Sequence, residues 1–157
     1  MKTIIALAAI GTMSLGLASQ AQAASLYKLS PSGNFTAKGA TVLNGPGGTL
    51  NCTATFGGRV SATGGGSVTS FTAVGDPGCS ALVATNLPWV AQAVNATQIA
   101  FRHVTVGIPG LFTCGSSSQT TKVTDSAGAV AFNTSLSGNC TTSGTVVTSP
   151  TVLIVHR

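Results

Sequence analysis

The stretch that decides the fold is LNCTATFGGRVSATGGGSVTSFTAVGDPGC, residues 50–79. Its first part has an apolar side chain at every second position and small polar residues between them; the apolar positions are Leu50, Cys52, Ala54 and Phe56. This alternation is typical of a β-strand with one buried face. The glycine run 64–66 predicts a turn, and residues 67–74 return as a second strand. The apolar parity slips between Val68 and Phe71, which indicates a β-bulge in that strand.

The rest of the chain repeats this rhythm of short apolar segments between turn residues. The further predicted strands are 94–108 (one long strand or a bent pair), 111–114, 120–124, 129–136, 145–148 and 151–155. Many short strands separated by Gly- and Pro-containing turns are typical of an all-β sandwich or barrel. The sequence therefore predicts an all-β fold, an antiparallel β-sandwich or flattened barrel, with at most one short helix near Cys79–Ala84.

The N-terminal residues have the parts of a secretory signal peptide. Lys2 gives a positive start, residues 4–17 form an apolar run, and Ala21-Gln22-Ala23 fits the small-x-small cleavage rule. We predict a signal peptide at 1–23 and a single secreted β-sandwich domain at 24–157. A membrane anchor is the alternative, but the run is shorter than the ~20 apolar residues that cross a bilayer, and no later stretch reaches that length. We expect no transmembrane segment in the mature chain, and an extracellular or cell-surface location with the periplasm as the alternative.

The chain carries few charges and no basic cluster. It has seven Lys and Arg residues against two acidic residues, and its formal net charge is +5 at pH 7. The basic residues are scattered along the sequence, so we expect no nucleic-acid partner. Ser, Thr and Gly replace charge as the polar component, and sparse charge lowers the cost of placing a protein surface against an apolar phase.

Four cysteines in an exported chain predict disulfide bonds before any other use. They are Cys52, Cys79, Cys114 and Cys140. Three pairings can be drawn. The intervals 52–79 and 114–140 are nearly equal and each contains two predicted strands and a turn, so we predict the pairs Cys52–Cys79 and Cys114–Cys140 in a disulfide-stapled sandwich. Zinc is the alternative, but there is no Cys-x-x-Cys spacing and only His103 and His156 could complete a site, so we expect no metal.

Few side chains could carry acid–base catalysis, which usually draws on His, Asp or Glu. Asp76 lies in Asp-Pro-Gly and Asp125 in Asp-Ser-Ala-Gly, where Asp commonly holds a turn. His103 lies within a predicted strand, and His156 is the penultimate residue. No Gly-x-Ser-x-Gly elbow supports a serine triad, and no glycine tract leads into a phosphate-binding loop. We therefore expect a protein that is not an enzyme and that has no cofactor.

Four segments together resemble a known family. They are Leu50-Asn51-Cys52-Thr53-Ala54-Thr55-Phe56, Gly65-Gly66-Ser67-Val68-Thr69, Asn86-Leu87-Pro88-Trp89 and Thr113-Cys114-Gly115. The chain resembles the small secreted proteobacterial proteins called protein activators of alkane oxidation, with Asn86 standing where the family pattern has glycine. The resemblance implies an exported, non-enzymatic protein that promotes n-alkane or hydrocarbon use by contacting or dispersing the hydrophobic substrate. It supplies no catalytic residues.

The last predicted strand is a candidate contact surface for hydrocarbon or a lipid-like surface. Val152 and Ile154 point to one face, and Leu153 and Val155 point to the other. Strands that are apolar on both faces are covered on both, whereas a small two-layer sandwich covers only one. We predict that one set packs in the core and the other contacts a neighbouring subunit or hydrocarbon. A loop or the short helix lying over the second face is the alternative.

Trp89 has two interpretations. It is a buried plug over one end of the sandwich, since Trp is strongly buried on average, or an exposed ring that extends the contact surface of Leu153 and Val155. An exposed ring could also stack on a sugar in a lectin-like sandwich, which few polar neighbours support. A further alternative function is a self-associating subunit of an extracellular fibre or biofilm matrix, assembled by strand addition or apolar contacts.

Overall fold

The computed structural model describes residues 26–123 and 127–157, and within that range the side chains of all residues but 117–123. The predicted signal peptide at 1–23 and Asp125 lie outside the described residues. The strands are β1 Tyr27–Ser30, β2 Gly33–Gly45, β3 Gly48–Val60, β4 Gly66–Gly75, β5 Val83–Thr85, β6 Trp89–Asn95, β7 Gln98–Ile108, β8 Phe112–Val123, β9 Ala129–Leu136, β10 Cys140–Ser149 and β11 Leu153–His156. The helical part of the described chain is η1, a 3-10 turn at Cys79–Ala81, inside the segment where the sequence allows one short helix. The all-β prediction is confirmed.

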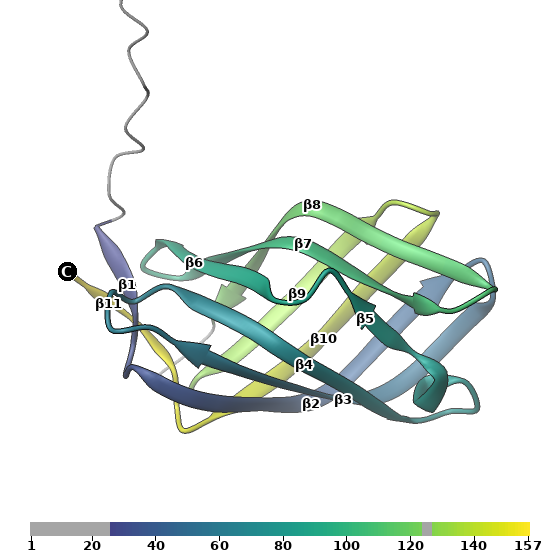
Figure 1. The fold of residues 1–157 in the computed structure, drawn as a ribbon, viewed down its shortest axis with the longest axis horizontal. Helices are drawn as coiled ribbons and strands as arrows, with labels where there is room; N and C mark the ends of the chain where they lie inside the picture. Colours follow the sequence, from purple (N-terminus) through teal and green to yellow (C-terminus); the bar gives the residue numbers. More distant parts are fainter. Residues whose placement is uncertain (1–25, 124–126) are drawn as a thin grey trace, which may run out of the picture.

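The strands form two layers, with antiparallel pairing throughout (Figure 1). One layer has the order β4-β3-β2-β10-β9; the other has β8 on one edge of β7, and β6 and β5 one after the other along its second edge. Short pairings join the layers at both sides, between β4 and β6 around Ser67↔Val90 and between β8 and β9 at Val123↔Val130. The strand pairings therefore run in a ring, which is the flattened two-layer architecture that the sequence predicts.

The hairpin of β3 and β4 contains the predicted bulge. Gly57 pairs with Ser70 and Gly58 pairs with Val68, so that Thr69 is the extra residue of β4. This is the place where the apolar parity slips, because one extra residue turns the following side chains to the opposite face. The bulge keeps Val68 and Ala73 both buried in the core, 4% and 5% exposed.

The predicted strand 94–108 is divided in the structure. β6 already begins at Trp89, and a turn after Asn95 separates β6 from β7. Asn95 Oδ1 accepts a hydrogen bond from the Thr97 backbone N at 2.9 Å, and Asn95 Nδ2 donates to Gln98 Oε1 at 2.6 Å. Asn side chains commonly close turns in this way. The apolar alternation on both sides of Asn95 does not reveal the turn, so it predicts one continuous strand.

The segments 111–114 and 120–124, predicted as two strands, are joined in the structure. β8 runs without a break from Phe112 to Val123, because it pairs with β7 along its length. Its middle, Gly-Ser-Ser-Ser-Gln, has no apolar residue, so the sequence gives no strand signal there. In the segment where a short helix is predicted, the 3-10 turn is followed by β5, which pairs with the end of β7.

β1 and β11 pair with each other and form a two-stranded ribbon at one end of the sandwich (Figure 1). The ribbon, residues 27–30 and 153–156, packs Leu29 and Ile154 against a core cluster that includes Val60 and Ile99. Val152, just before β11, is 8% exposed and belongs to the same cluster. Val152 and Ile154 are therefore the set of the last strand that faces the core.

The outer face of the ribbon carries the second set. Leu153 pairs with Ser30 and Val155 pairs with Lys28, so that two half-buried aliphatic side chains share this face with a hydroxyl and an ammonium group. The short helical turn η1, one of the elements considered as a cover for this face, lies at the opposite end of the molecule (Figure 1). The role of Leu153 and Val155 as a contact surface stays a prediction.

The end of the sandwich opposite the ribbon is held by two disulfide bonds. Cys52–Cys79 joins β3 to η1 with a Cα–Cα distance of 5.7 Å, and Cys114–Cys140 joins β8 to β10 with a Cα–Cα distance of 5.8 Å. Both predicted pairs are therefore present. This region, named the disulfide end, consists of the two bonds and four connections, residues 45–48, 76–82, 108–112 and 137–139.

Candidate functional site

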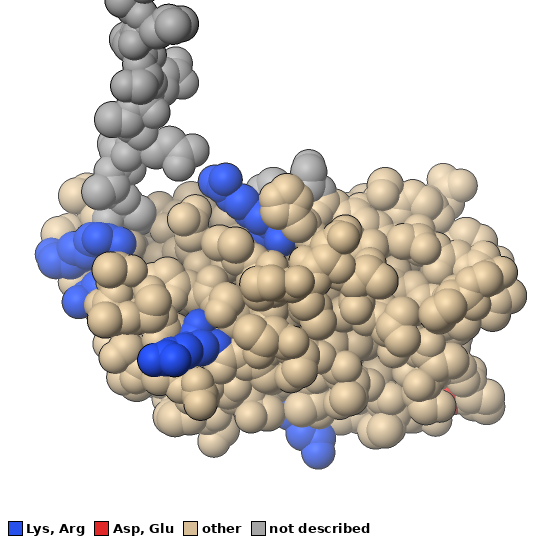
Figure 2. Space-filling model, in the orientation of Figure 1, with Lys and Arg blue, Asp and Glu red and all other residues tan. Residues whose placement is uncertain are grey.

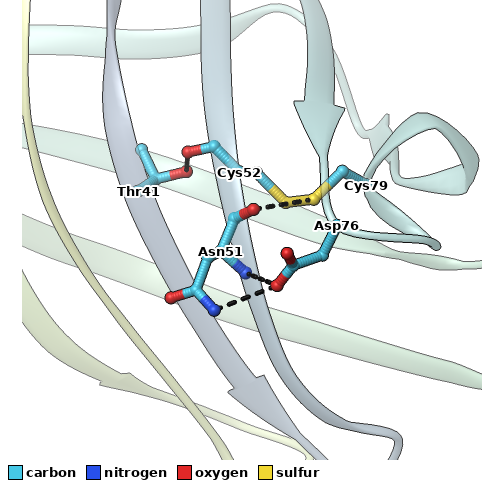
Figure 3. The surroundings of a disulfide bond; sticks show 5 residues. All are labelled: Thr41, Asn51, Cys52, Asp76 and Cys79. Carbon is cyan, nitrogen blue, oxygen red and sulfur yellow. Dashed lines mark hydrogen bonds between the residues drawn. A yellow bond between two sulfur atoms is a disulfide. The ribbon is translucent and has the colours of Figure 1, made fainter.

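The Asp76 carboxylate fixes one connection of the disulfide end to the neighbouring strand (Figure 3). Asp76 Oδ2 accepts hydrogen bonds from the Asn51 backbone N at 2.8 Å and from Asn51 Nδ2 at 2.9 Å. The Asp76 backbone N in turn donates to Asn51 O at 3.2 Å, and the Cys79 backbone N donates to Asp76 O at 2.9 Å. The hydrogen bond from the Asn51 backbone, followed by the one from its side chain, lowers the pKa of Asp76. Asp76 is thus a structural anchor beside the Cys52–Cys79 bond.

Apolar side chains cover the disulfide end. Leu50, Ile108 and Phe112 are half-buried and pack against the cluster that contains all four cysteines. Two glycines allow this close cover: a Cβ on Gly47 would lie 3.3 Å from the Phe112 ring, and a Cβ on Gly78 would lie 3.2 Å from Leu50 Cδ2. Leu111 stands out from this cover and is 74% exposed.

The Lys and Arg side chains that the structure describes lie away from the disulfide end. Figure 2 shows them over the ribbon end and the middle of the visible face, and none over the disulfide end. Two basic residues lie at the ribbon end. Lys28 belongs to β1, and Arg157 Nη2 donates a hydrogen bond to Thr63 O at 3.1 Å. In the four connections that form the disulfide end, all of which are described, Asp76 is the one charged residue. One end of the molecule is therefore basic and the other is apolar and nearly uncharged.

A cavity of about 140 Å³ lies in the interior between the two layers. Its wall is mostly apolar and includes residues of both layers, among them Ala37, Ala54, Phe56, Gly66, Trp89 and Ala91. Three Thr residues lie in the wall, Thr41, Thr142 and Thr148, and the hydroxyl groups of Thr41 and Thr148 are hydrogen-bonded. Thr41 Oγ1 donates to Cys52 O at 3.2 Å, and Thr148 Oγ1 donates to Gly128 O at 3.2 Å and accepts from Val152 N at 2.8 Å.

Trp89 belongs to this interior and not to an outer surface. It is 3% exposed, and its Nε1 donates a hydrogen bond to Thr85 O at 2.9 Å. Its ring lies 6.3 Å from that of Phe56, centroid to centroid. The interpretation as an exposed apolar or sugar-stacking ring is corrected, because the indole is buried with its polar atom satisfied, as a core Trp requires.

The residues considered for catalysis are not brought together. His103 lines a shallow, open depression with Asn86, Ser116 and Ser135, and no carboxylate is among the described residues around it. His156 stacks edge-on against Tyr27 in the ribbon, with the ring centroids 5.4 Å apart. Asp76 lies at the other end of the molecule, and Asp125 is outside the described residues.

No three His, Cys, Asp or Glu side chains in the described part of the chain are arranged to hold a metal ion. In that same part, no helix has the length and apolar character to cross a membrane. The features left as candidate functional sites are the disulfide end, with its single charged residue, and the interior cavity. Sequence reasoning missed both, since each depends on how distant strands are placed.

A family model matches residues 1–156 of this chain, and its description is alkane oxidation protein activator, PraA/PraB-like. Comparison with curated proteins and comparison with solved structures each returned no match.

Proposed function

Because the chain belongs to the family of PraA/PraB-like alkane oxidation protein activators, we propose that it is an exported, non-enzymatic protein that promotes n-alkane use by adsorbing to hydrocarbon surfaces through its disulfide end. The observation that carries the proposal is the distribution of charge. The disulfide end has one charged residue, Asp76, and presents Leu111 and the half-buried cover of Leu50, Ile108 and Phe112.

The energetics favour this end over the ribbon end. Each Å² of apolar surface that leaves water contributes about 25 cal/mol. Transfer of a charged group to an apolar phase costs several kcal/mol, so the Lys and Arg side chains around the ribbon oppose contact there. A molecule with one nearly uncharged end and one basic end therefore has a preferred orientation at an oil–water boundary, with the disulfide end toward the oil.

The disulfide bonds support both the export and the surface role. Disulfides persist in oxidising compartments outside the cytoplasm, which fits the signal peptide proposed at 1–23. The two bonds also hold the connections of the disulfide end in place, so that adsorption does not require the core to open. The non-enzymatic role is supported by the separation of Asp76, His103 and His156 and by the family description as an activator.

Adsorption of the purified mature protein to n-hexadecane droplets tests this proposal. Leu111→Lys places an ammonium group on the proposed contact and is expected to weaken adsorption several-fold. Leu26→Lys is the matched control, because Leu26 is 66% exposed next to the ribbon, close to the 74% of Leu111 at the opposite end. If both variants adsorb as the wild type does, or both lose adsorption equally, the assignment to the disulfide end is wrong.

A second candidate function, a subunit of an extracellular fibre or matrix, is favoured by the ribbon. Within the described residues β11 has one strand partner, β1, so its other edge is available for strand addition. The outward aliphatic pair Leu153 and Val155 lies on the same strand. Fractionation of the source culture separates the two functions: protein on oil droplets or free in the medium supports the surface role, whereas protein that sediments as fibres supports assembly.

A further inference from the structure

We propose that the interior cavity binds a single short n-alkane molecule. The inference goes beyond adsorption at the disulfide end and does not depend on it, because the cavity lies between the two layers and Leu111 does not line it. It assigns a second kind of hydrocarbon contact to the protein, with one dissolved molecule rather than with a droplet.

The size of the cavity sets the size of the ligand. Protein interiors are close-packed and contain few voids larger than a water molecule. The volume here is about 140 Å³. An apolar cavity of about 150 Å³ in another protein stays dry and binds benzene, so this space suits a hydrocarbon of roughly six carbons.

The shape of the cavity favours a chain over a ring. Its wall reaches from Leu29 and Val152 at the ribbon to Leu82 and Leu136 at the disulfide end. The lining residues therefore run along the long direction of the sandwich, between the two layers. An extended n-alkane can lie lengthwise in such a space, whereas a planar six-membered ring is wider than a single chain.

The chemistry of the wall disfavours polar ligands. Of the three Thr residues in the wall, Thr41 and Thr148 already use their hydroxyl groups in hydrogen bonds to Cys52 O and Gly128 O, and Thr142 is the third. In the described residues no buried side-chain nitrogen or oxygen lacks a partner. A ligand hydroxyl or carboxylate inside the cavity would exchange its water for the Thr142 hydroxyl at most, which leaves it incompletely hydrogen-bonded and is costly. An alkane has no such group to satisfy.

The cavity exists because small residues occupy inward positions opposite large ones. Ala37, Ala54 and Ala91 lie in the wall and are 5%, 1% and 3% exposed. They face an interior that also contains Phe56 and Trp89. An unfilled cavity lowers stability in proportion to its volume. A bound hydrocarbon restores the missing contacts and so explains why the positions are not filled by larger side chains.

The ribbon end provides the route into the cavity. Leu29 of the ribbon and the adjoining Val152 form part of the wall, so a displacement of the ribbon uncovers the interior. β1 and β11 form a sheet of their own, separate from the large sheet. The disulfide end, by contrast, is cross-linked by Cys52–Cys79 and Cys114–Cys140.

Titration of the mature wild-type protein with n-hexane tests the proposal directly. The hexane is kept below its solubility limit, so that no droplets are present. Trp89 is the one Trp of the chain and lines the cavity, so its fluorescence reports occupancy. We expect a saturable change in Trp89 emission and a rise in Tm with hexane concentration, because a ligand that binds only the folded state stabilises it. 1-Hexanol at the same concentration is expected to give a smaller rise in Tm. A wild-type protein that responds to hexane in neither measurement overturns the proposal.

Filling the cavity tests its location. Ala54→Leu extends a side chain into the space and is expected to abolish the hexane response while the protein stays folded. Ala93→Leu is the matched control, since Ala93 is also buried, at 5% exposed, but does not line the cavity. The folded Ala93 variant is expected to keep the response. A folded Ala54 variant that responds to hexane as the wild type does places the binding elsewhere and contradicts the proposal.

Two further variants keep the test decisive. If Ala54→Leu does not fold, Ala37→Leu fills the same cavity from β2 and is judged by the same criterion. Leu111→Lys separates this proposal from the proposed function: it is expected to lose droplet adsorption and to keep the full hexane response. Loss of the hexane response in a folded Leu111 variant would show that both signals come from the disulfide end.

Discussion

Asp76 and Asn51 are joined by two hydrogen bonds to the same carboxylate oxygen, one from the Asn51 backbone N at 2.8 Å and one from its Nδ2 at 2.9 Å. The contact ties the connection before η1 to β3, one residue before Cys52. The disulfide Cys52–Cys79 links the same connection to β3 a second time, three residues after Asp76 (Figure 3). The disulfide end is therefore fixed by a covalent and an electrostatic link in parallel.

The link predicts how stability depends on pH. The pKa of Asp76 is lowered from 3.8 in the folded protein, since Asn51 donates to the charged form. A lowered folded pKa means that the contribution to the free energy of unfolding is present above the unfolded pKa of about 3.9 and is lost as pH falls through the folded pKa. We expect Asp76→Ala to destabilise the protein at pH 6 and to be nearly neutral at the lowest pH where the protein stays folded. Chemical denaturation at several pH values measures this, and a pH-independent difference contradicts it.

Removal of each disulfide is expected to lower stability by a similar amount. The bonds close loops with sequence separations of 27 and 26 residues. Loops of this length correspond to about 3.5 kcal/mol each in the chain-entropy model. The paired replacements Cys52→Ala with Cys79→Ala, and Cys114→Ala with Cys140→Ala, test this by denaturant unfolding. A cost near zero for either pair would show that its bond does not form in the folded protein, and non-reducing peptide mapping then identifies the true pairing.

The hairpin of β3 and β4 could be predicted from sequence because its signals are local. Alternating apolar residues, the glycine run before β4 and the parity slip around Thr69 all lie within one contiguous stretch. The disulfide pairs could be predicted because the intervals 52–79 and 114–140 are nearly equal and each contains two predicted strands and a turn. The ribbon could not be found in this way, because Tyr27–Ser30 is short and its partner, Leu153–His156, lies at the other end of the chain.

The candidate sites could not be predicted from the sequence, because they too are formed by residues that are far apart in the chain. Lys28, Arg59 and Arg157 are far apart in the chain, yet β1, the end of β3 and the C-terminus all lie toward the ribbon end. Basic residues that are scattered in the sequence therefore gather at one end of the fold, and the other end has Asp76 as the one charged residue of its connections. The cavity likewise depends on which small residues meet across two layers, such as Gly66 of β4 and Ala91 of β6.

The two faces of β11 are expected to respond differently to charge. Val152→Lys with Ile154→Lys buries ammonium groups in the core cluster under the ribbon, so we expect the free energy of unfolding to fall by several kcal/mol. Leu153→Lys with Val155→Lys changes the half-buried outer face, and we expect it to fold. Denaturant unfolding compares the pairs. The folded double variant then tests the outer face as a contact surface. Droplet adsorption through the disulfide end is expected to stay unchanged, and an unchanged sedimentation profile would remove Leu153 and Val155 from the proposed fibre or matrix function.

His103 adopts a left-handed backbone conformation, with φ at 61°, where β7 passes from pairing with β6 to pairing with β5. For residues other than Gly and Asn this conformation costs about 1 kcal/mol. We expect His103→Asn to raise the free energy of unfolding by up to about 1 kcal/mol, because the short polar side chain of Asn can hydrogen-bond locally in this conformation. His156→Asn, at a position without positive φ, is the control and is expected to give no gain. Both variants should keep full activity in an alkane-growth assay, since no Asp or Glu lines the depression at His103, and His156 contacts Tyr27 and Arg157 O. A His103 variant that is folded by circular dichroism but inactive would assign the strained histidine a role in function and end the non-enzymatic proposal.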